Sequence, residues 1–230
     1  GGYVRDRLLN RESSDIDIMV EGDAILYAKM LGNELGVPKI VEFKEFGTAR
    51  IPYEKFEIEV SSARSESYTK DSRNPKIELS TFKDDMSRRD FTVNAIAASI
   101  HPDNFGDLHD PFGGIKDLHK GLIITPLDPD STFDDDPLRM LRAIRFSAQL
   151  NFDIAPNLMD SISRMKDRIK IISWERVTYE IIKILNTPKP SVGLYALRDT
   201  GLLDILLPEF SIMQGIETRD NMSHKDVFIH

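Results

Sequence analysis

The 230-residue chain contains no cysteine, which excludes disulfide bonds and thiolate metal sites. A chain without cysteine is compatible with a reducing compartment, and we expect a cytoplasmic protein. The sequence also lacks any run of about 18 apolar residues, so we expect no membrane-spanning helix and no membrane partner. Its formal net charge of −8 at pH 7 disfavours a uniformly basic nucleic-acid binder.

The sequence is apolar enough to form a packed core, because 40% of its residues are hydrophobic. At this length we expect one or two domains. Acidic residues outnumber basic ones in residues 1–59, and the reverse holds in residues 139–176. An acidic, metal-binding part followed by a basic helical part could hold a nucleic-acid backbone, although a solvated helix face gives the same charge bias.

The first 20 residues, GGYVRDRLLNRESSDIDIMV, combine features that suit phosphate chemistry. Gly1 and Gly2 let backbone N–H groups approach a phosphate, and a helix N-terminus just after them favours an anion. Asp15 and Asp17 lie two apart on an expected strand, so their carboxylates share a face. Such a pair needs a cation between its charges, and Mg²⁺ takes one or two carboxylates plus substrate phosphates. The alternative is a surface turn followed by an edge strand with outward acids.

Two shorter motifs follow along the chain. Arg88 and Arg89 open the stretch RRDFTVNA, and arginines suit a triphosphate because one guanidinium can grip two phosphate oxygens. A helix N-terminus with surface arginines is the alternative interpretation. The stretch Asp110–Gly114, DPFGG, has turn chemistry, and we assign it a structural and hinge role.

The stretch Thr132–Leu150, TFDDDPLRMLRAIRFSAQL, predicts a helix. Asp135 or Asp136 can cap its N-terminus, and Pro137 fits the first turn. Cations recur every three residues along one flank, at Arg139, Arg142 and Arg145. A capped helix with a salt-bridged surface would give the same pattern.

With these motifs in this order, the chain resembles the nucleotidyltransferase superfamily that includes DNA polymerase β. More narrowly, it looks like the class II CCA-adding tRNA nucleotidyltransferases and their bacterial poly(A) polymerase relatives. The resemblance covers residues 1–209 and departs from the usual motif EDxxR at Asp135, which replaces the Glu. It implies transfer of CMP and AMP from CTP and ATP to the 3′ end of tRNA, with release of pyrophosphate. The implied cofactor is Mg²⁺.

The resemblance also implies roles for individual residues. Asp15 and Asp17 would hold the metal and act in catalysis. On the strand expected at residues 55–60, Glu57 and Glu59 share a face, and alignment with the family favours Glu59 as a third catalytic carboxylate. A solvent-facing acid is an equally good interpretation. Nucleotide contacts are implied for Gly2, Arg5, Arg89, Asp136, Arg139, Arg142 and Arg145.

Asp136 and Arg139 predict the choice of base, since residues three apart share a helix face. A carboxylate only accepts hydrogen bonds and a guanidinium only donates them. Cytosine and adenine both present an amine donor beside a ring-nitrogen acceptor, whereas uracil and guanine present the reverse. The pair therefore predicts selection of C and A without a nucleic-acid template, while Arg142 and Arg145 steady the helix or the phosphates.

Several alternatives stay open within and outside this family. A poly(A) polymerase, an A-only enzyme or a CC-only enzyme would share most of these motifs. The stretch FGTARI resembles the CCA-adding type, and the long polar loop expected at residues 61–82 disfavours a CC-only enzyme. A small-molecule nucleotidyltransferase would share residues 1–17 but would not need the cationic row. The sequence gives no indication of the oligomeric state.

The expected fold class is α+β. Residues 1–125 would form a nucleotidyltransferase head with a mixed, largely antiparallel sheet that places the strand at 55–60 beside Asp15–Asp17. Residues 126–190 would form an all-α neck that recognises the base, and residues 191–230 the start of a helical body or HD-like region. The expected elements are strands at 39–43, 48–52 and 55–60, a hairpin around 102–104, a stretch at 122–124 that closes the head, and helices at 23–35, 155–172, 173–185, 191–200 and 202–207. We expect the helix at 173–185 to bury Trp174, Val177, Ile181, Ile182, Ile184 and Leu185.

Overall fold

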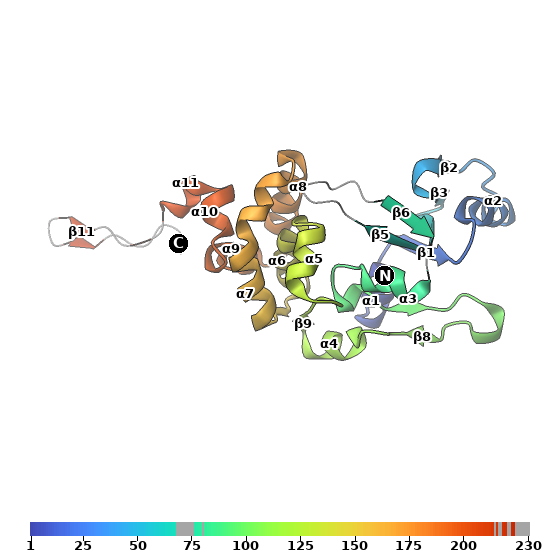
Figure 1. Ribbon diagram of the computed structural model, residues 1–230, viewed down its shortest axis with the longest axis horizontal. Coiled ribbons are helices and arrows are strands. Elements are labelled where there is room, and N and C mark those ends of the chain that lie inside the picture. The colour runs from blue at the N-terminus through green and yellow to red at the C-terminus, as the bar shows by residue number, and fades with distance from the viewer. Residues whose placement is uncertain (68–75, 80, 214, 216–217, 220–221, 224–230) are drawn as a thin grey trace. The chain divides into compact units, whose positions relative to one another are not determined.

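The computed structural model describes residues 1–67, 76–79, 81–213, 215, 218–219 and 222–223 (Figure 1). They fall into two compact units: residues 1–120 with 124–128 (unit 1), and residues 121–123 with 129–230 (unit 2). The division expected at residues 125 and 190 stays a prediction. The expected HD-like ending at His224–His230 lies outside the described residues.

Unit 1 is built on a four-stranded mixed sheet with strand order β1-β4-β3-β2. β1 runs parallel to β4, whereas β3 pairs antiparallel with both β4 and β2. The sheet therefore confirms the expected mixed, largely antiparallel head with the strand at 55–60 beside Asp15–Asp17. Its strands are β1 (Asp15–Val20), β2 (Val41–Phe43), β3 (Thr48–Tyr53) and β4 (Phe56–Ser62).

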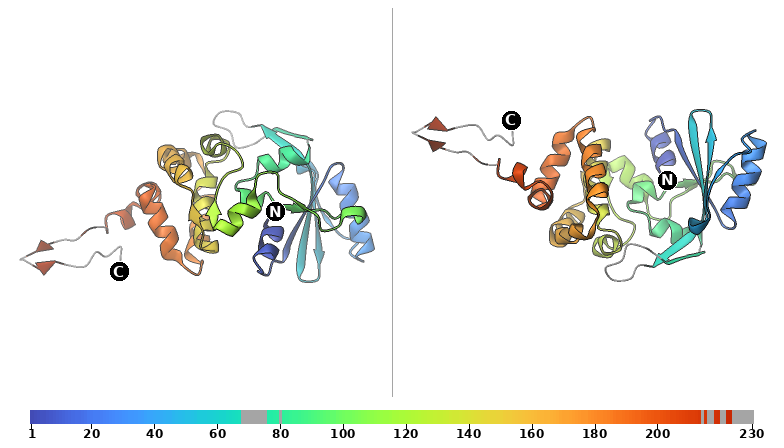
Figure 2. Two further views of the ribbon diagram at one scale, coloured as in Figure 1. Left: turned by 90° about the horizontal axis from the view of Figure 1, so that it is seen from below. Right: turned by 90° about the horizontal axis from the view of Figure 1, so that it is seen from above.

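One face of this sheet is covered by α2 (Ala24–Glu34), which Figure 2 shows running along the strands. Asp23 caps the helix by accepting hydrogen bonds from the backbone N–H groups of Ile25 and Leu26, both at 3.0 Å. Alternate strand residues turn their apolar side chains toward α2, because side chains alternate between the two faces of a strand. The buried residues of this core are Ala24, Ala28, Ala49, Ile51, Ile58 and Val60. The opposite face of the sheet is thereby left to the polar residues in between.

The rest of unit 1 consists of short elements. Within the expected loop at 61–82, β5 pairs antiparallel with β6, so the loop prediction is wrong for these two strands. Residues 68–75 and 80 of that loop lie outside the described residues. The expected hairpin around residues 102–104 is confirmed by the pairing of β7 with β8. These elements are α1 (Gly2–Leu8), a 3-10 turn (Lys44–Phe46), β5 (Arg64–Ser67), β6 (Lys76–Leu79), α3 (Phe82–Ser87), a 3-10 turn (Thr92–Asn94), β7 (Ala97–Ala98), a 3-10 turn (Pro102–Asn104), β8 (Leu108–His109) and α4 (Gly114–Lys120).

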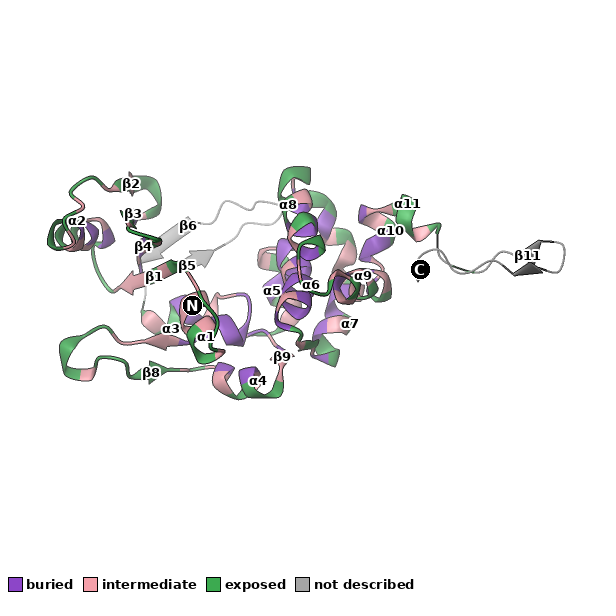
Figure 3. Cartoon of the chain, turned by 180° about the vertical axis from the view of Figure 1, so that it is seen from behind, coloured by how far each residue is buried: buried purple, intermediate pink, exposed green. Residues whose placement is uncertain are grey.

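Unit 2 is a helical assembly around α6 (Leu138–Leu150), whose side chains are mostly buried (Figure 3). Of the stretch expected to close the head, Ile124 lies in unit 1, whereas Leu122 and Ile123 do not. They form β9 (Leu122–Ile123), which pairs with β10 (Asp153–Ile154) in a parallel ladder in unit 2. The remaining elements are α5 (Pro129–Asp135), α7 (Pro156–Met165), a 3-10 helix (Lys166–Ile171), α8 (Trp174–Leu185), α9 (Pro190–Asp199), α10 (Leu202–Leu206), α11 (Pro208–Ser211), β11 (Thr218–Arg219) and β12 (Met222–Ser223). None of the helices in the described part of the chain has the length and apolar character that crossing a membrane requires.

The apolar stripe of α8 is narrower than its sequence indicates. Val177, Ile181 and Ile184 are buried, as expected. Trp174 is 60% exposed, and Ile182 and Leu185 are also exposed, so the prediction that these three lie inside is wrong. Only one side of α8 packs on α6 and α9, and a helix buries the stripe that faces its neighbours.

Candidate active site

Four carboxylates share the open face of the sheet in unit 1. The parallel register places Asp15 opposite Glu57 and Asp17 opposite Glu59. Asp17 keeps part of its surface exposed, yet burial raises the pKa of its carboxyl above the usual value. Glu59 and Asp15 add to that rise in the pKa through their negative charge, whereas Arg89 opposes it. Desolvation is therefore the main cost of charging Asp17, and a bound cation would offset it.

Arg50 on β3 already balances the two glutamates. Its Nη1 lies 3.0 Å from Glu57 Oε1, and its Nε donates to Glu59 Oε2 at 2.9 Å. The bond to Glu59 raises the pKa of Arg50 further above its usual value. Among the described residues, no group of three or more His, Cys, Asp or Glu side chains is arranged to hold a metal ion. Asp15 and Asp17 still fit Mg²⁺, which needs only one or two carboxylates when substrate phosphates complete its shell.

Gly1 lies close to the side chains of both Asp17 and Arg89, the second arginine of the RRDFT stretch. A Cβ at Gly1 would lie 3.3 Å from Asp17 Oδ2 and 4.0 Å from Arg89 Nη1. A side chain here would therefore push into the carboxylate. A Cβ at Gly2 would meet only Arg5 Nη2, at an ordinary 3.7 Å. The close approach of the glycine pair to a phosphate stays a prediction, and so does a nucleotide contact at Gly2.

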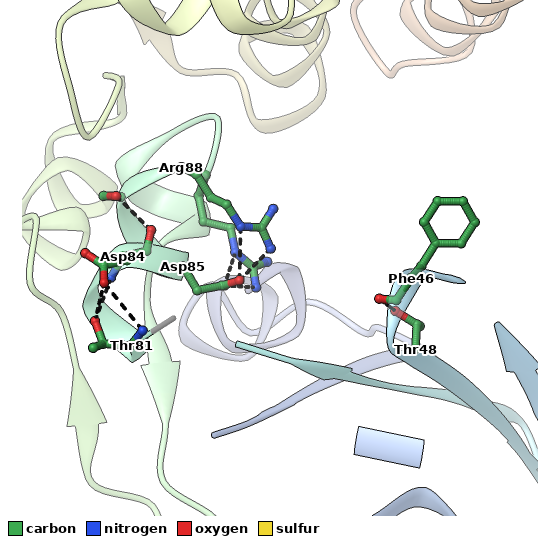
Figure 4. Close-up of polar contacts among 8 residues, drawn as sticks. Phe46, Thr48, Thr81, Asp84, Asp85 and Arg88 are labelled. Atoms are coloured by element: carbon green, nitrogen blue, oxygen red, sulfur yellow. Dashed lines mark hydrogen bonds and ion pairs between the residues drawn. The ribbon is translucent and has the colours of Figure 1, made fainter. Parts of the chain in front are cut away.

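Asp85 holds both arginines of the pair and was not identified from the sequence. Its side chain is fully buried, with Oδ1 accepting from Arg88 Nη2 at 2.5 Å and Oδ2 from Arg89 Nη2 at 3.0 Å. Figure 4 shows Asp85 facing Arg88, while its neighbour Asp84 turns to Thr81. The signal in the sequence is the helical spacing of three and four residues from Asp85 to the two arginines.

Arg5 belongs to a buried hydrogen-bond chain rather than to an open surface. It is 4% exposed, and its Nε and Nη2 both donate to Asp6 at 2.8 Å. Its Nη1 donates to Asn94 Oδ1 at 2.5 Å, and Asn94 donates to Asp90 at 2.9 Å. Asp90 also accepts from the backbone N–H of Phe91 at 2.8 Å. This chain ties α1 to the 3-10 turn at residues 92–94, so Asp90 and Asn94 fix the local backbone.

The glycine pair of the DPFGG stretch is structural in unit 1. Asp110 accepts hydrogen bonds from the backbone N–H groups of Gly114 at 2.7 Å and Ile115 at 2.9 Å. A Cβ on Gly114 would come within 2.1 Å of the Thr92 carbonyl oxygen, a separation no side chain can adopt. This close packing places α4 against the turn that follows the arginine pair.

In unit 2, Asp136 precedes Pro137, which occupies the N-cap position of α6, so the predicted capping of this helix by Asp135 or Asp136 is wrong. Its carboxylate accepts from the backbone N–H of Leu138 at 3.1 Å and from Arg176 Nη2 at 3.2 Å. Arg139 is largely buried, and its Nη1 lies 3.4 Å from the Thr132 carbonyl oxygen. Arg176 comes from α8, 40 residues along the chain, and no sequence pattern pointed to it.

The other two arginines of the row differ in environment. Arg145 donates from Nε to Glu180 Oε2 at 2.6 Å and from Nη1 to Gln149 at 2.8 Å, and its guanidinium lies 4.0 Å from the Phe146 ring centroid. Both Arg145 and Glu180 are buried, so this arginine steadies the packing of α6 on α8. Arg142 is only partly buried and lies 5.5 Å from the same ring. A nucleotide contact by either arginine stays a prediction.

Comparison with known proteins places the chain beside one family. Residues 1–124 match the family described as the Poly A polymerase head domain, and residues 151–213 match a probable RNA and SrmB-binding site of polymerase A. An A-adding tRNA nucleotidyltransferase of Aquifex aeolicus is 46% identical over 155 residues, covering 67% of this chain and 18% of that protein. A CCA-adding enzyme of Bacillus licheniformis is 38% identical over 205 residues, covering 88% of this chain and 49% of that protein.

The fold also has solved counterparts. A crystal structure of a tRNA nucleotidyltransferase complexed with a primer tRNA and an incoming ATP analog superposes with a TM-score of 0.77 and 34% sequence identity. The superposition covers 90% of this chain and 58% of that one. The chain thus spans half or less of the length of the two curated relatives.

Proposed function

The chain belongs to the Poly A polymerase head-domain family, and from that premise we propose that it is a template-independent tRNA nucleotidyltransferase. The proposed reaction adds CMP and AMP, taken from CTP and ATP, to the 3′ end of tRNA. The 3′-hydroxyl oxygen bonds to the α-phosphorus, the bond from that phosphorus to the β-phosphate breaks, and pyrophosphate leaves. The hydroxyl proton is lost to solvent.

The observation that carries this proposal is the Asp15–Asp17 pair on the open sheet face, next to Gly1 and Arg89. Asp15 and Asp17 would hold Mg²⁺, which when bound lowers the pKa of the attacking hydroxyl and stabilises the attacking and leaving oxygens. Arg89, held by Asp85, grips the triphosphate whatever the base. Glu59 completes the acidic face as a third carboxylate. The nucleotide contact implied for Arg5 stays a prediction, and its guanidinium is engaged by Asp6 and Asn94.

Base choice is proposed to lie with Asp136 and Arg139 in unit 2. The carboxylate accepts from the exocyclic amine of C or A, and the guanidinium donates to the adjacent ring nitrogen. Uracil and guanine would leave these groups unpaired, and sites built on hydrogen-bond matching reject such partners by as much as roughly 10⁴–10⁵. The bond from Arg176 supports this role because it fixes one Asp136 oxygen.

The test is incubation of the full-length protein with tRNA lacking its 3′ end and each of the four nucleotides in turn, with Mg²⁺. Transfer from CTP and ATP, and neither from UTP nor from GTP, is the expected result. Asp17→Ala should abolish transfer while tRNA binding and the melting temperature stay near those of the wild type. Near-normal turnover of Asp17→Ala would remove the carboxylate pair from the mechanism.

The base-choice part has its own test. Asp136→Ala should lower kcat/KM for CTP and ATP and relax the exclusion of UTP, and Arg139→Ala should do likewise. The measurement is kcat/KM for all four nucleotides on each variant. Full retention of the preference for C and A in Asp136→Ala would contradict selection by the protein.

Addition of AMP alone is the second candidate, because relatives of this chain include A-adding tRNA nucleotidyltransferases from Aquifex aeolicus and Geobacter sulfurreducens. Two acceptors separate the candidates: a tRNA that ends before CCA and a tRNA that ends in CC. An A-adding enzyme extends only the second, and only with ATP. An enzyme that adds the whole triplet extends both.

A further inference from the structure

The open face of the sheet in unit 1 carries a hollow of about 440 Å³ beside the acidic residues. All four strands contribute to its walls, through Asp15 on β1, Glu57 on β4, Arg50 on β3 and Phe43 on β2. Binding sites for small molecules usually measure about 300–1,000 Å³, so the hollow is large enough for one nucleoside. Neither the triphosphate grip nor the base-choice pair uses it.

The carboxylates of Asp17, Glu57 and Glu59 lie between Arg89 and Arg50, which approach them from different directions. Arg89, which follows α3, approaches Asp17 next to Gly1, from outside the sheet. Arg50 approaches Glu57 and Glu59 from β3, on the inner side of β4. If Arg89 holds the triphosphate, the leaving pyrophosphate lies on the Arg89 side of the carboxylates. In phosphoryl transfer the attacking and leaving oxygens are roughly in line, so the acceptor must come from the Arg50 side.

We propose that the hollow binds the terminal ribonucleoside of the acceptor RNA. This inference rests on the proposed function, and it adds the position of the second substrate. Phe43 offers an aromatic face for the base, with the Arg50 guanidinium 5.4 Å from its ring centroid. The carboxylates of Asp15 and Glu57 are acceptors only, and the ribose 2′- and 3′-hydroxyls are the donors that suit them. The hydroxyl that attacks thereby lies on the Asp15 side.

The charges of the hollow favour a nucleoside over a phosphate group. Arg50 is engaged by two glutamates, which leaves it little positive potential for a phosphate. An incoming triphosphate would meet three acids in the lining, Asp15, Glu54 and Glu57, against Lys55 and the engaged Arg50. A base and a ribose carry no charge, so they can fill the same space without repulsion.

Phe43 supplies the test, and Phe46 supplies its matched control. Phe43 is 37% exposed and is one of the residues that line the hollow. Phe46, in the 3-10 turn that follows β2, is 54% exposed and is not one of the lining residues. The variants are Phe43→Ala, Phe43→Leu and Phe46→Ala in the full-length protein, each checked by its melting temperature. The substrates are a tRNA transcript that ends in CC, and ATP. KM is measured for each substrate with the other saturating, and transcript binding is measured separately by fluorescence anisotropy.

The expected result is a rise of about tenfold in the transcript KM for Phe43→Ala, as base stacking on an aromatic ring predicts, with an unchanged KM for ATP. Phe43→Leu keeps the apolar bulk but loses the ring face, and should give most of that rise even where the alanine variant folds poorly. Phe46→Ala should change neither constant. A transcript KM in Phe43→Leu equal to that of the wild type, or a rise in the KM for ATP instead, would overturn the assignment. If the wild type transfers no nucleotide to any tRNA, it is the proposed function that fails.

Discussion

Each unit contains a buried carboxylate that holds an arginine, yet the two arginines differ in exposure. In unit 2, Glu180 binds Arg145, and both side chains are under 10% exposed. In unit 1, Asp85 is equally buried, but the side chain of Arg89 is 24% exposed. A buried pair uses its charge to fix packing, whereas a buried acid that holds a partly exposed arginine can present the guanidinium to a ligand. The same interaction thus steadies a helix in one unit and, under the proposed function, leaves the Arg89 guanidinium accessible to a phosphate in the other.

The largest effect should come from breaking the fully buried pair. Glu180→Ala leaves the Arg145 guanidinium buried without its carboxylate, and such a change costs about 3–5 kcal/mol of unfolding free energy. For a chain of this size the melting temperature should fall by roughly 6–20 °C. The exposed Glu175 lies on the same helix, and Glu175→Ala is the matched control, with little expected change. Equal melting temperatures for the two variants would show that the pair does not stabilise unit 2.

A smaller, kinetic effect should come from Asp85→Asn. The amide keeps the shape of the carboxylate but loses its charge, so Arg89 is held less firmly beside Asp17. Hydrogen bonds to charged groups contribute about 1.5–3 kcal/mol, which predicts a KM for ATP and CTP raised by at least about tenfold. Asp84→Asn, one residue earlier, alters the carboxylate that pairs with Thr81 and should leave both KM values unchanged.

A double-mutant cycle separates positioning from general stability. If Asp85 acts through Arg89, the Asp85→Asn effect on KM should disappear in an Arg89→Ala background. It should persist in an Arg88→Ala background. An Asp85→Asn effect of the same size in both backgrounds would contradict the positioning role and would assign Asp85 to the packing of α3.

The contrast between the two pairs also shows what sequence alone could predict. Alternation along a strand is a local property, so the shared face of Asp15 and Asp17, and that of Glu57 and Glu59, followed from their spacing. The Asp85 spacing was equally local and was overlooked. The partner of Arg145 is 35 residues away and that of Arg5 is 89 residues away, and no local period encodes such pairings.

Burial on α8 illustrates the same limit. Its sequence has apolar residues on more than one side, and periodicity cannot tell which of them meet a neighbouring helix. The packing of α8 against α6 and α9 selects Val177, Ile181 and Ile184 and leaves Trp174 exposed. The fold class was predictable because it needs only the type and order of the elements, whereas the partners of buried charges depend on the assembled structure.

The smallest effect should come from Arg142, the member of the cationic row that is neither buried like Arg145 nor beside Asp136. Its guanidinium lies 5.5 Å from the Phe146 ring, and a cation–π contact at a partly exposed site contributes about 0.5–1 kcal/mol. Arg142→Ala should therefore lower the melting temperature by a few degrees at most and reduce kcat/KM for CTP and ATP by the same small factor. Arg142→Lys keeps the charge and should recover part of both losses. The preference for C and A over U and G should stay intact, since Arg142 takes no part in the hydrogen-bond match. Measuring all four nucleotides on Arg142→Ala and Arg139→Ala side by side decides this, because a loss of base choice in Arg142→Ala would extend the recognition site along the row.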